Sequence, residues 1–182
     1  TLFTMNDGGR AAVVLDTGAL TRGSGSKNED KERNIRQWFV DHDYIDGVIL
    51  LPDNLFYNTT AAGVIVILNK RKPANRKDKV ILLNASHRAT KGKPKNLLAD
   101  ADVKTLAGLY TAAQLAEGDL AIVDKADLVA ADYNLSPARW VRRAFQVEER
   151  SVSELLAELI AIDESAVKIN DAVYRLVKQV AQ

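Results

Sequence analysis

The sequence has no cysteine among its 182 residues. This excludes a disulfide framework, a thiolate zinc site and a cysteine nucleophile. It also fits a reducing compartment, so we expect a cytoplasmic protein. No apolar run is long enough to span a bilayer, and the first residues, TLFTMNDGG, lack the charged head and apolar stretch of a signal peptide. We therefore expect no association with a membrane.

An excess of charge of one sign is also lacking. Lysine and arginine number 25 and aspartate and glutamate 24, which leaves a formal net charge of +1. The chain as a whole is therefore not an electrostatic nucleic-acid binder, and a surface of that kind has to come from local clustering. The two histidines, His42 and His87, are far apart in sequence and lack a partner at metal-ligand spacing, so we expect no metal site.

Apolar residues make up 47% of the chain and charged residues 27%, which is typical of a globular protein with a substantial core. Short runs rich in branched apolar residues alternate with helical periodicity, and this pattern predicts an α/β fold with a largely parallel sheet. The expected strands are Arg10–Leu15, which we take to be buried on both faces, Ile45–Leu51, Ala61–Asn69 and Lys79–Asn84; the expected helices are Glu29–Asp41 and Asp100–Ala113. The strands that flank Leu51–Thr60 are joined too closely for a crossover helix, so we expect them to be antiparallel neighbours. The glycine-rich segment Arg22–Ser26 matches no phosphate-binding motif and is interpreted as a flexible surface loop.

The C-terminal region contains the clearest periodic pattern in the sequence. Apolar residues alternate at spacings of three and four, which is typical of a helix with a heptad seam. The seam consists of Val152, Leu155, Leu159, Ile162, Ala166, Ile169, Val173, Leu176 and Val180. We therefore expect two parts: an α/β domain over residues 1–145 and an amphipathic helix over residues 150–182. From its periodicity alone, this helix can pack back on its own domain or on a partner.

A strongly basic stretch lies between Asn69 and Asn96. Its candidate DNA-backbone contacts are Lys70, Arg71, Lys72, Arg76, Lys91 and Lys93. A solvated loop surface and a phosphate-contacting surface explain this stretch equally well. Pro73 and Pro94 keep both of its segments out of helix, as in loops that follow a nucleic-acid backbone.

The segment LPDNLFYNTT, from Leu51 to Thr60, places two aromatic residues in a turn between two strands. Phe56 and Tyr57 cannot both point into one core if the turn is tight. Taken alone, the segment favours an interpretation in which one ring covers the core and the other lies on the surface.

Several segments together resemble the modification (methyltransferase) subunits of type I restriction–modification systems. GRAAVVLDTGAL is similar to their GRAAVVLPxGxLF, and VILLPDNLFYNTTAAGVIVILNKRK is similar to their xVIxLPxNLFYGTxIxxxIxVLxKxK. KVILLNAS, KGKPKNLLADADVKTLAGLY and ADYNLSPARWV follow in the order in which that family has their counterparts. The ordered resemblance covers Gly9 to Val141.

The resemblance implies the C-terminal part of a Rossmann-like, S-adenosylmethionine-dependent methyltransferase sheet that methylates the N6 amine of adenine in DNA. The family's cofactor motif and its NPPF-type catalytic tetrapeptide lie N-terminal to the matched part, and the sequence contains neither Asn-Pro-Pro nor Asp-Pro-Pro. We therefore expect no catalytic residue in this chain. S-adenosylmethionine is expected in the full-length subunit and not on these residues alone.

What the resemblance leaves to this chain is the side that faces the target base. An aromatic at this position stacks on the extruded base in related enzymes, which implies Phe56 first and Tyr57 second, with Asn54 and Thr59 beside them. The family usually has glycine where Asn58 stands, and asparagine tolerates the positive φ of such a turn better than most residues.

The resemblance also implies partners. These are DNA, the DNA-specificity subunit and the restriction subunit of the same system. The seam residues expected to face a partner helix are Leu155, Leu159, Ile162, Ile169, Val173 and Leu176. In isolation the seam could also drive homodimerisation. The alternative function is a non-catalytic assembly or DNA-binding module, whose DNA affinity would be present in this chain alone and would depend steeply on salt.

Overall fold

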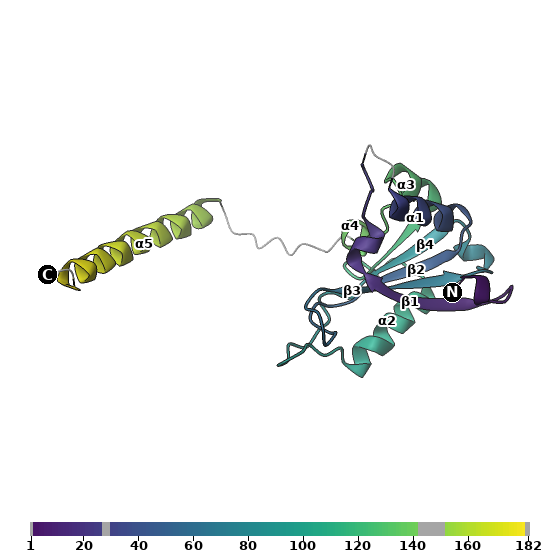
Figure 1. Cartoon of the computed structure of the whole chain (residues 1–182), viewed down its shortest axis with the longest axis horizontal. Helices are drawn as coiled ribbons and strands as arrows, with labels where there is room; N and C mark the ends of the chain where they lie inside the picture. The colour runs from purple at the N-terminus through teal and green to yellow at the C-terminus, as the bar shows by residue number, and fades with distance from the viewer. Residues whose placement is uncertain (1, 27–29, 142–151, 181–182) are drawn as a thin grey trace. The chain divides into compact units, whose positions relative to one another are not determined.

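The computed structural model describes residues 2–26, 30–141 and 152–180. The chain divides into two compact units, Thr1–Ala144 and Phe145–Gln182, and each is considered by itself (Figure 1). The first unit contains a mixed sheet with helices on both faces. The second contains one long helix.

The sheet has five strands in the order β1-β3-β2-β4-β5. β1 pairs antiparallel with β3, β3 antiparallel with β2, β2 parallel with β4, and β4 antiparallel with β5. Their bounds are β1 Arg10–Asp16, β2 Ile45–Leu50, β3 Gly63–Asn69, β4 Lys79–Asn84 and β5 Leu120–Asp124. The antiparallel pairing that we predicted for the two strands around the aromatic turn is confirmed.

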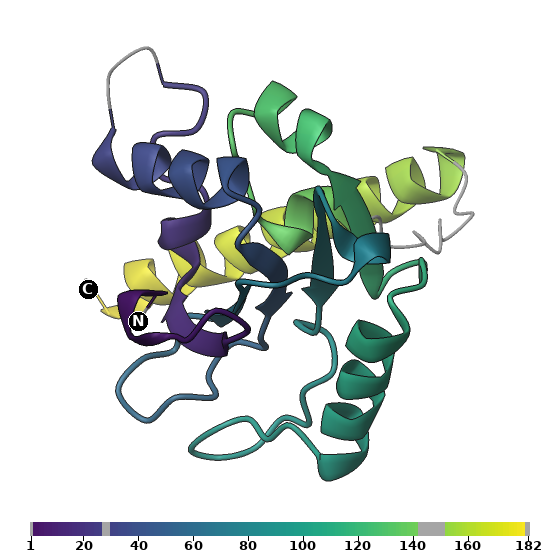
Figure 2. The same ribbon diagram turned by 90° about the vertical axis from the view of Figure 1, so that its right-hand side faces the viewer.

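Helices cover the two faces of the sheet unequally. Within residues 2–26 and 30–141, helices α1, α3 and α4 lie on one face, and α2 is the one helix on the other (Figures 1 and 2). The helix bounds are α1 Lys31–Asp41, α2 Asp100–Ala112, α3 Lys125–Ala130 and α4 Pro137–Trp140, with 3-10 turns η1 Leu2–Thr4, η2 Thr17–Leu20 and η3 Ala74–Arg76. Strand β4 shows how the layers form, because its side chains alternate between faces. Val80 and Leu82 join the core under α1 and α3, whereas Ile81 and Leu83 pack under α2.

Two predictions about the sheet are wrong. It is not largely parallel, because among the strands that the structure describes only β2 and β4 pair in parallel. Runs of branched apolar residues indicate strands, but they carry no information about strand direction. Strand β1 is also not buried on both faces: it is an edge strand, and Val14 and Leu15 are 56% and 40% exposed. The apolar run identified the strand without specifying how many neighbours it has.

The element predictions agree closely for α1, β2, β3, β4 and α2. Strand β5 and helices α3 and α4 were not predicted. These elements have five, six and four residues, which is too short for a periodic pattern to stand out.

A buried polar cluster links the amino ends of β2 and β4 to α2. Asp46 has no exposed surface, and its Oδ2 accepts hydrogen bonds from the Tyr110 hydroxyl and from Arg76 Nη1 at 3.3 Å. Arg76 also donates to the carbonyl oxygens of Tyr110 and Thr111 at 2.6 and 3.0 Å, near the end of α2. Burial, followed by the contact with Asp46, raises the pKa of Tyr110, which keeps its hydroxyl a donor. The Tyr110 ring lies so close to Gly47 that a Cβ there would be 2.8 Å from Tyr110 Cε2.

The Asp46–Arg76 pair predicts a large stability effect for Arg76→Met in the full chain. The variant leaves the buried Asp46 carboxylate without its cation, and breaking one side of such a pair costs about 3–5 kcal/mol of unfolding free energy. Lys77→Met removes a neighbouring exposed cation and should change the same free energy by less than about 0.5 kcal/mol. Urea denaturation followed by circular dichroism measures both. Equal effects of the two variants would contradict the assigned role of Arg76.

The second unit consists of helix α5, Val152–Val180. Among its described side chains, Leu159, Ile162, Ile169 and Val173 are between 51% and 64% exposed. The side chains of Leu155 and Leu176 lie outside the described part of the chain. No helix among the described residues is both long enough and apolar enough to cross a membrane.

Candidate functional site

Strands β1, β2 and β4 run in the same direction and end at the same edge of the sheet. Ligands of open α/β sheets bind outside the carboxyl ends of such strands. Three connections leave the sheet at this edge, and their described residues are 17–26 after β1, 51–62 after β2 and 85–99 after β4. The carboxyl edge, defined by these three connections, is therefore the candidate site.

The aromatic turn after β2 separates its two rings. Phe56 is partly buried and packs against the start of β3, where a Cβ on Gly63 would be 2.7 Å from Phe56 Cε2. Tyr57 is 89% exposed. One ring thus covers the core and the other lies on the surface, as the segment taken alone suggested. Of the two candidates for base stacking, Tyr57 is the one whose ring is free.

Asn54 and Thr59, named with the aromatics as target-base residues, bond within the turn and to its neighbouring loop. Asn54 has a φ of 51°. Its N–H donates to the Thr60 carbonyl oxygen at 2.9 Å, and its side chain bonds to Pro94 and Lys95. The Thr59 hydroxyl accepts a hydrogen bond from the Ala61 N–H at 3.0 Å. Both residues shape the turn that carries Tyr57.

The prediction that Lys72 and Arg76 contact DNA is wrong. The Lys72 side chain is 2% exposed, forms an ion pair with Asp43, and donates to the Lys79 carbonyl oxygen at 2.8 Å. Arg76 is 8% exposed and is held by Asp46 and the end of α2. The aliphatic stems of both side chains are long enough to carry their charges into the fold, where carboxylates compensate them.

The remaining cations do not form one surface. Lys91 and Lys93 are exposed in the connection after β4, at the carboxyl edge. Arg71 is exposed after β3, and Lys70 is half-buried and donates to the Met5 carbonyl oxygen at 2.6 Å. Because β3 has seven residues and is antiparallel to β2, its end lies roughly 20 Å away at the opposite edge. Of these four candidate DNA contacts, Lys91 and Lys93 share the carboxyl edge with the aromatic turn.

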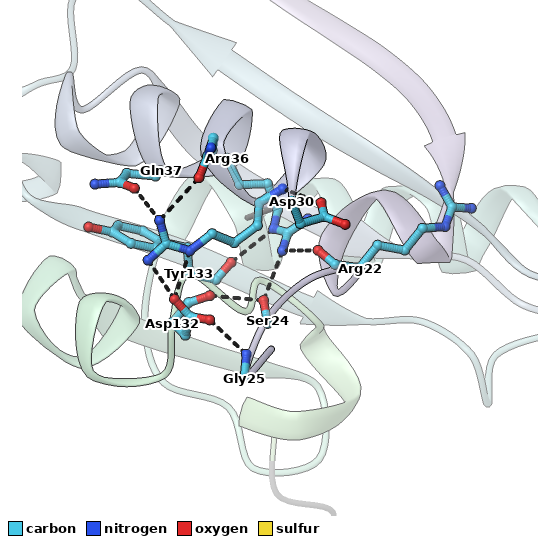
Figure 3. Close-up of polar contacts among 10 residues, drawn as sticks. Arg22, Ser24, Gly25, Asp30, Arg36, Gln37, Asp132 and Tyr133 are labelled. Atoms are coloured by element: carbon cyan, nitrogen blue, oxygen red, sulfur yellow. Dashed lines mark hydrogen bonds and ion pairs between the residues drawn. The ribbon is translucent and has the colours of Figure 1, made fainter. Parts of the chain in front are cut away.

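The connection after β1 is held by a buried arginine that the sequence analysis did not single out. Arg36 on α1 is 5% exposed. It donates to the carbonyl oxygens of Arg22 and Tyr133 at 2.6 and 3.1 Å and to Ser24 Oγ at 2.8 Å (Figure 3). It also donates to the Ala19 carbonyl oxygen at 3.1 Å. Four acceptors from two loops therefore converge on one guanidinium. Burial is the main cause of the lowered pKa of Arg36.

Asp132 provides the second fastening of this connection. Its carboxylate accepts from the Gly25 N–H at 2.6 Å and from Arg33 Nε and Nη2 at 2.8 and 2.6 Å (Figure 3). Its carbonyl oxygen accepts from Ser24 Oγ at 2.8 Å. The segment Arg22–Ser26, predicted to be a flexible loop, is thus tied to the segment that follows α3. The family resemblance does include the segment DYNLSPARWV, which begins at Asp132. The residues around Asp132 nevertheless give no indication that its partners are Ser24 and Gly25, more than a hundred positions earlier.

The sequence pattern of the N-6 DNA Methylase family matches residues 1–149. The chain belongs to the N-6 DNA Methylase family. It is 39% identical over 153 residues to the type I restriction enzyme MjaVIII methylase subunit of Methanocaldococcus jannaschii, a match that covers 82% of this chain and 25% of the relative. The chain spans about a quarter of the length of the curated relatives that it matches first. The resemblance to modification subunits of type I systems is confirmed.

Solved structures agree with this membership of the N-6 DNA Methylase family. The methyltransferase subunit of a type I restriction–modification system from Streptococcus thermophilus is 32% identical, with a TM-score of 0.66 over 73% of this chain and 26% of that one. The M protein of the type I restriction enzyme EcoKI shares the fold, with a TM-score of 0.59 at 17% identity over 96% of this chain and 42% of that one.

From the hydrogen bonds of the Asp132 carboxylate we predict a specific pH dependence of stability. The hydrogen bond from Gly25, followed by those from Arg33, lowers the pKa of Asp132 below its usual value. The stability that this carboxylate contributes is therefore present above the unfolded pKa of about 3.9 and is lost as the pH falls through and below it. Asp132→Asn keeps the size and the tolerance of the observed φ of 52° but removes the charge.

In urea denaturation, Asp132→Asn should be less stable than the parent chain at pH 7, and this difference should shrink between about pH 5 and pH 3. Asp127→Asn, which changes an exposed aspartate on α3, serves as the matched control. A difference between Asp132→Asn and the parent that stays constant over this pH range would contradict the assigned role of the Asp132 carboxylate.

Proposed function

We propose that this chain forms the target-base side of a DNA methyltransferase subunit of a type I restriction–modification system. The full subunit transfers a methyl group from S-adenosylmethionine to the N6 amine of adenine. Within it, these residues are the C-terminal part of a Rossmann-like sheet. One observation carries the proposal: in a chain of the N-6 DNA Methylase family, an almost fully exposed tyrosine ring stands at the carboxyl edge of the sheet.

Chemistry on adenine N6 requires that the base leave the duplex, which costs a few kcal/mol. An aromatic ring that stacks on the extruded base returns about 1–3 kcal/mol. Tyr57 can do this because its ring is exposed, whereas Phe56 packs against β3. Phe56 then packs against β3 and holds the turn that carries Tyr57 against the sheet. This reverses the order in which the sequence analysis ranked the two residues.

Two polar side chains at and after the end of β1, Asp16 and Ser24, are already bonded within the fold and are not free to hold S-adenosylmethionine. At the carboxyl edge, Asp16 accepts hydrogen bonds from the Ala19 N–H and from Arg22 at 3.2 and 2.6 Å. Ser24 is bonded to Arg36 and Asp132. These groups are committed to the fold, and the chain has neither the glycine-rich cofactor turn nor the NPPF-type tetrapeptide. We infer that the rest of the full subunit binds the cofactor and carries the catalytic residues.

Lys91 and Lys93 are the cations that we propose as DNA-backbone contacts beside the target base. Both are exposed on the same edge as Tyr57, in the connection after β4. A phosphate-contacting lysine adds affinity that depends on salt and carries no sequence information. Reading of the recognition sequence is assigned to the DNA-specificity subunit.

The base-stacking role predicts that Tyr57→Ala in the full-length subunit lowers the methylation rate by about tenfold or more, because the ring's 1–3 kcal/mol is lost. Tyr57→Phe retains the ring and should stay near the parent rate. Transfer of a labelled methyl group to a duplex with one target site measures both. If Tyr57→Ala kept full activity while Phe56→Ala lost it, the stacking role would return to Phe56.

The second candidate function is assembly through α5. Four of its described apolar side chains, Leu159, Ile162, Ile169 and Val173, are exposed and recur at spacings of three, seven and four, which fits a heptad seam. A row of this kind is stabilised by burial against another helix. We propose that α5 packs on helices of the DNA-specificity subunit, and that the restriction subunit joins the same assembly. The alternative for the isolated chain is a homodimer through the same seam.

Assembly through α5 predicts that deletion of Val152–Gln182 abolishes binding to the DNA-specificity subunit and leaves the α/β unit folded. A sharper variant is Ile162→Asp/Ile169→Asp, which places two carboxylates in the seam. Ala157→Asp/Ala161→Asp adds the same charge at heptad positions outside the seam and should bind far better. Size-exclusion chromatography with light scattering measures complex formation and any homodimer. Equal binding by the two double variants would remove the seam from the interface.

A further inference from the structure

The connection after β4 lies against the aromatic turn. Thr90 and Leu97 exchange two backbone hydrogen bonds of 2.9 and 3.0 Å, which close the intervening residues into a loop. We call residues 90–97 the bracing loop. From its far end, Pro94, Lys95 and Asn96 make side-chain and main-chain hydrogen bonds to the turn that carries Tyr57. Two loops that are about 40 positions apart in sequence thus form one unit.

Asn54 is the point at which the two loops join. Its carbonyl oxygen accepts from the Asn96 N–H at 3.0 Å. Its Nδ2 donates to the Pro94 carbonyl oxygen at 3.3 Å, and its Oδ1 accepts from Lys95 Nζ at 3.0 Å. Together with its N–H bond to Thr60, this engages every polar group of Asn54, and these bonds hold it at its positive φ.

Lys95 and Asn96 hold the turn at separate points. Lys95 Nζ bridges Asn54 Oδ1 and the Thr59 carbonyl oxygen, at 3.0 and 3.2 Å, and these two residues stand on either side of Tyr57. Asn96 Nδ2 donates to the carbonyl oxygen and Oδ1 of Asp53 at 3.0 and 3.1 Å. The backbone on both sides of the exposed ring is therefore braced, while the ring itself stays free.

We propose that Lys95 and Asn96 are positioning residues for Tyr57. This inference rests on the proposed function. It adds that the lysines of one basic loop have two different roles. Lys91 and Lys93 face solvent and contact DNA phosphates. The half-buried Lys95 instead donates its hydrogen bonds to the aromatic turn. Stacking stabilises the extruded base only to the extent that the ring is already held where the base arrives. Loss of the brace therefore lowers the yield of extrusion more than it lowers affinity for DNA.

The test uses the full-length subunit assembled with its DNA-specificity subunit. Lys95→Met keeps the length and the apolar stem but removes the donors, and Lys95→Arg restores donors. Lys93→Met measures the effect of losing a loop charge by itself. Three quantities are recorded for each variant: kcat for methyl transfer at saturating DNA, DNA affinity as a function of salt, and fluorescence of 2-aminopurine at the target position, which reports extrusion.

Lys95→Met should lower kcat about tenfold and reduce the 2-aminopurine signal in parallel, since misplacement of a bound group by a small distance has effects of this order or larger. Lys95→Arg should recover most of both. Lys93→Met should act mainly on affinity, with the salt slope reduced by about 1. Asn96→Ala, which removes the bonds to Asp53, should resemble Lys95→Met. Hydrogen exchange should quicken at the Asn54 and Asn96 amides in Lys95→Met without a global change in protection.

Two results would overturn the inference. If Lys95→Met behaved as Lys93→Met does, with a change in salt slope and an unaltered 2-aminopurine signal, Lys95 would be a phosphate contact. If Lys95→Met were indistinguishable from the parent subunit, the brace would have no role in positioning. Tyr57→Ala separates this inference from the proposed function. If Tyr57→Ala leaves kcat and the 2-aminopurine signal unchanged, the stacking role itself fails. If Tyr57→Ala lowers both while Lys95→Met leaves them unchanged, only the positioning role of Lys95 is rejected.

Discussion

The short connection between β2 and β3 makes these strands antiparallel neighbours, because a chain that turns within residues 51–62 has no room for a crossover helix. Much of the first unit follows from this constraint. It places the aromatic turn at the edge where β1, β2 and β4 end. It puts β3 beside β2, and it sends the chain that follows β3 to the opposite edge. The candidate site is therefore assembled from connections that are distant in sequence.

Several cationic side chains of this chain have a structural role, which its near-zero net charge does not reveal. Arg36, Lys72 and Arg76 are all buried, and each holds backbone carbonyl oxygens from other elements. A guanidinium or ammonium can satisfy several carbonyl oxygens at once, which an apolar side chain cannot do. The cost is desolvation, which Asp43 and Asp46 offset for Lys72 and Arg76 through ion pairs. These interior cations fasten loops and helix ends to the sheet.

For the two aromatics of the turn, the sequence motif and the structure give different information: the motif names the segment, and the structure shows which ring is exposed. From the family resemblance we expect an aromatic of this segment to meet the target base, but Phe56 and Tyr57 are adjacent and chemically alike. Packing separates them, because Gly63 leaves space for one ring against β3 and the other ring remains in solvent. The hydrogen bonds from Lys95 and Asn96 hold the backbone of the turn that carries this exposed ring.

By itself the sequence determined the main strands and helices, the antiparallel hairpin around the turn, the family, and the apolar seam of the last helix. These features depend on local periodicity, chain length between elements, and motif order, all of which are written along the chain. Only the tertiary structure decided that β1 is an edge strand, that Lys72 and Arg76 are interior, and that Asp132 and Lys95 brace loops. A lysine has the same local pattern whether its stem runs outward or inward. Its direction depends on partners such as Asp43 or Asn54, which the fold brings from tens of residues away.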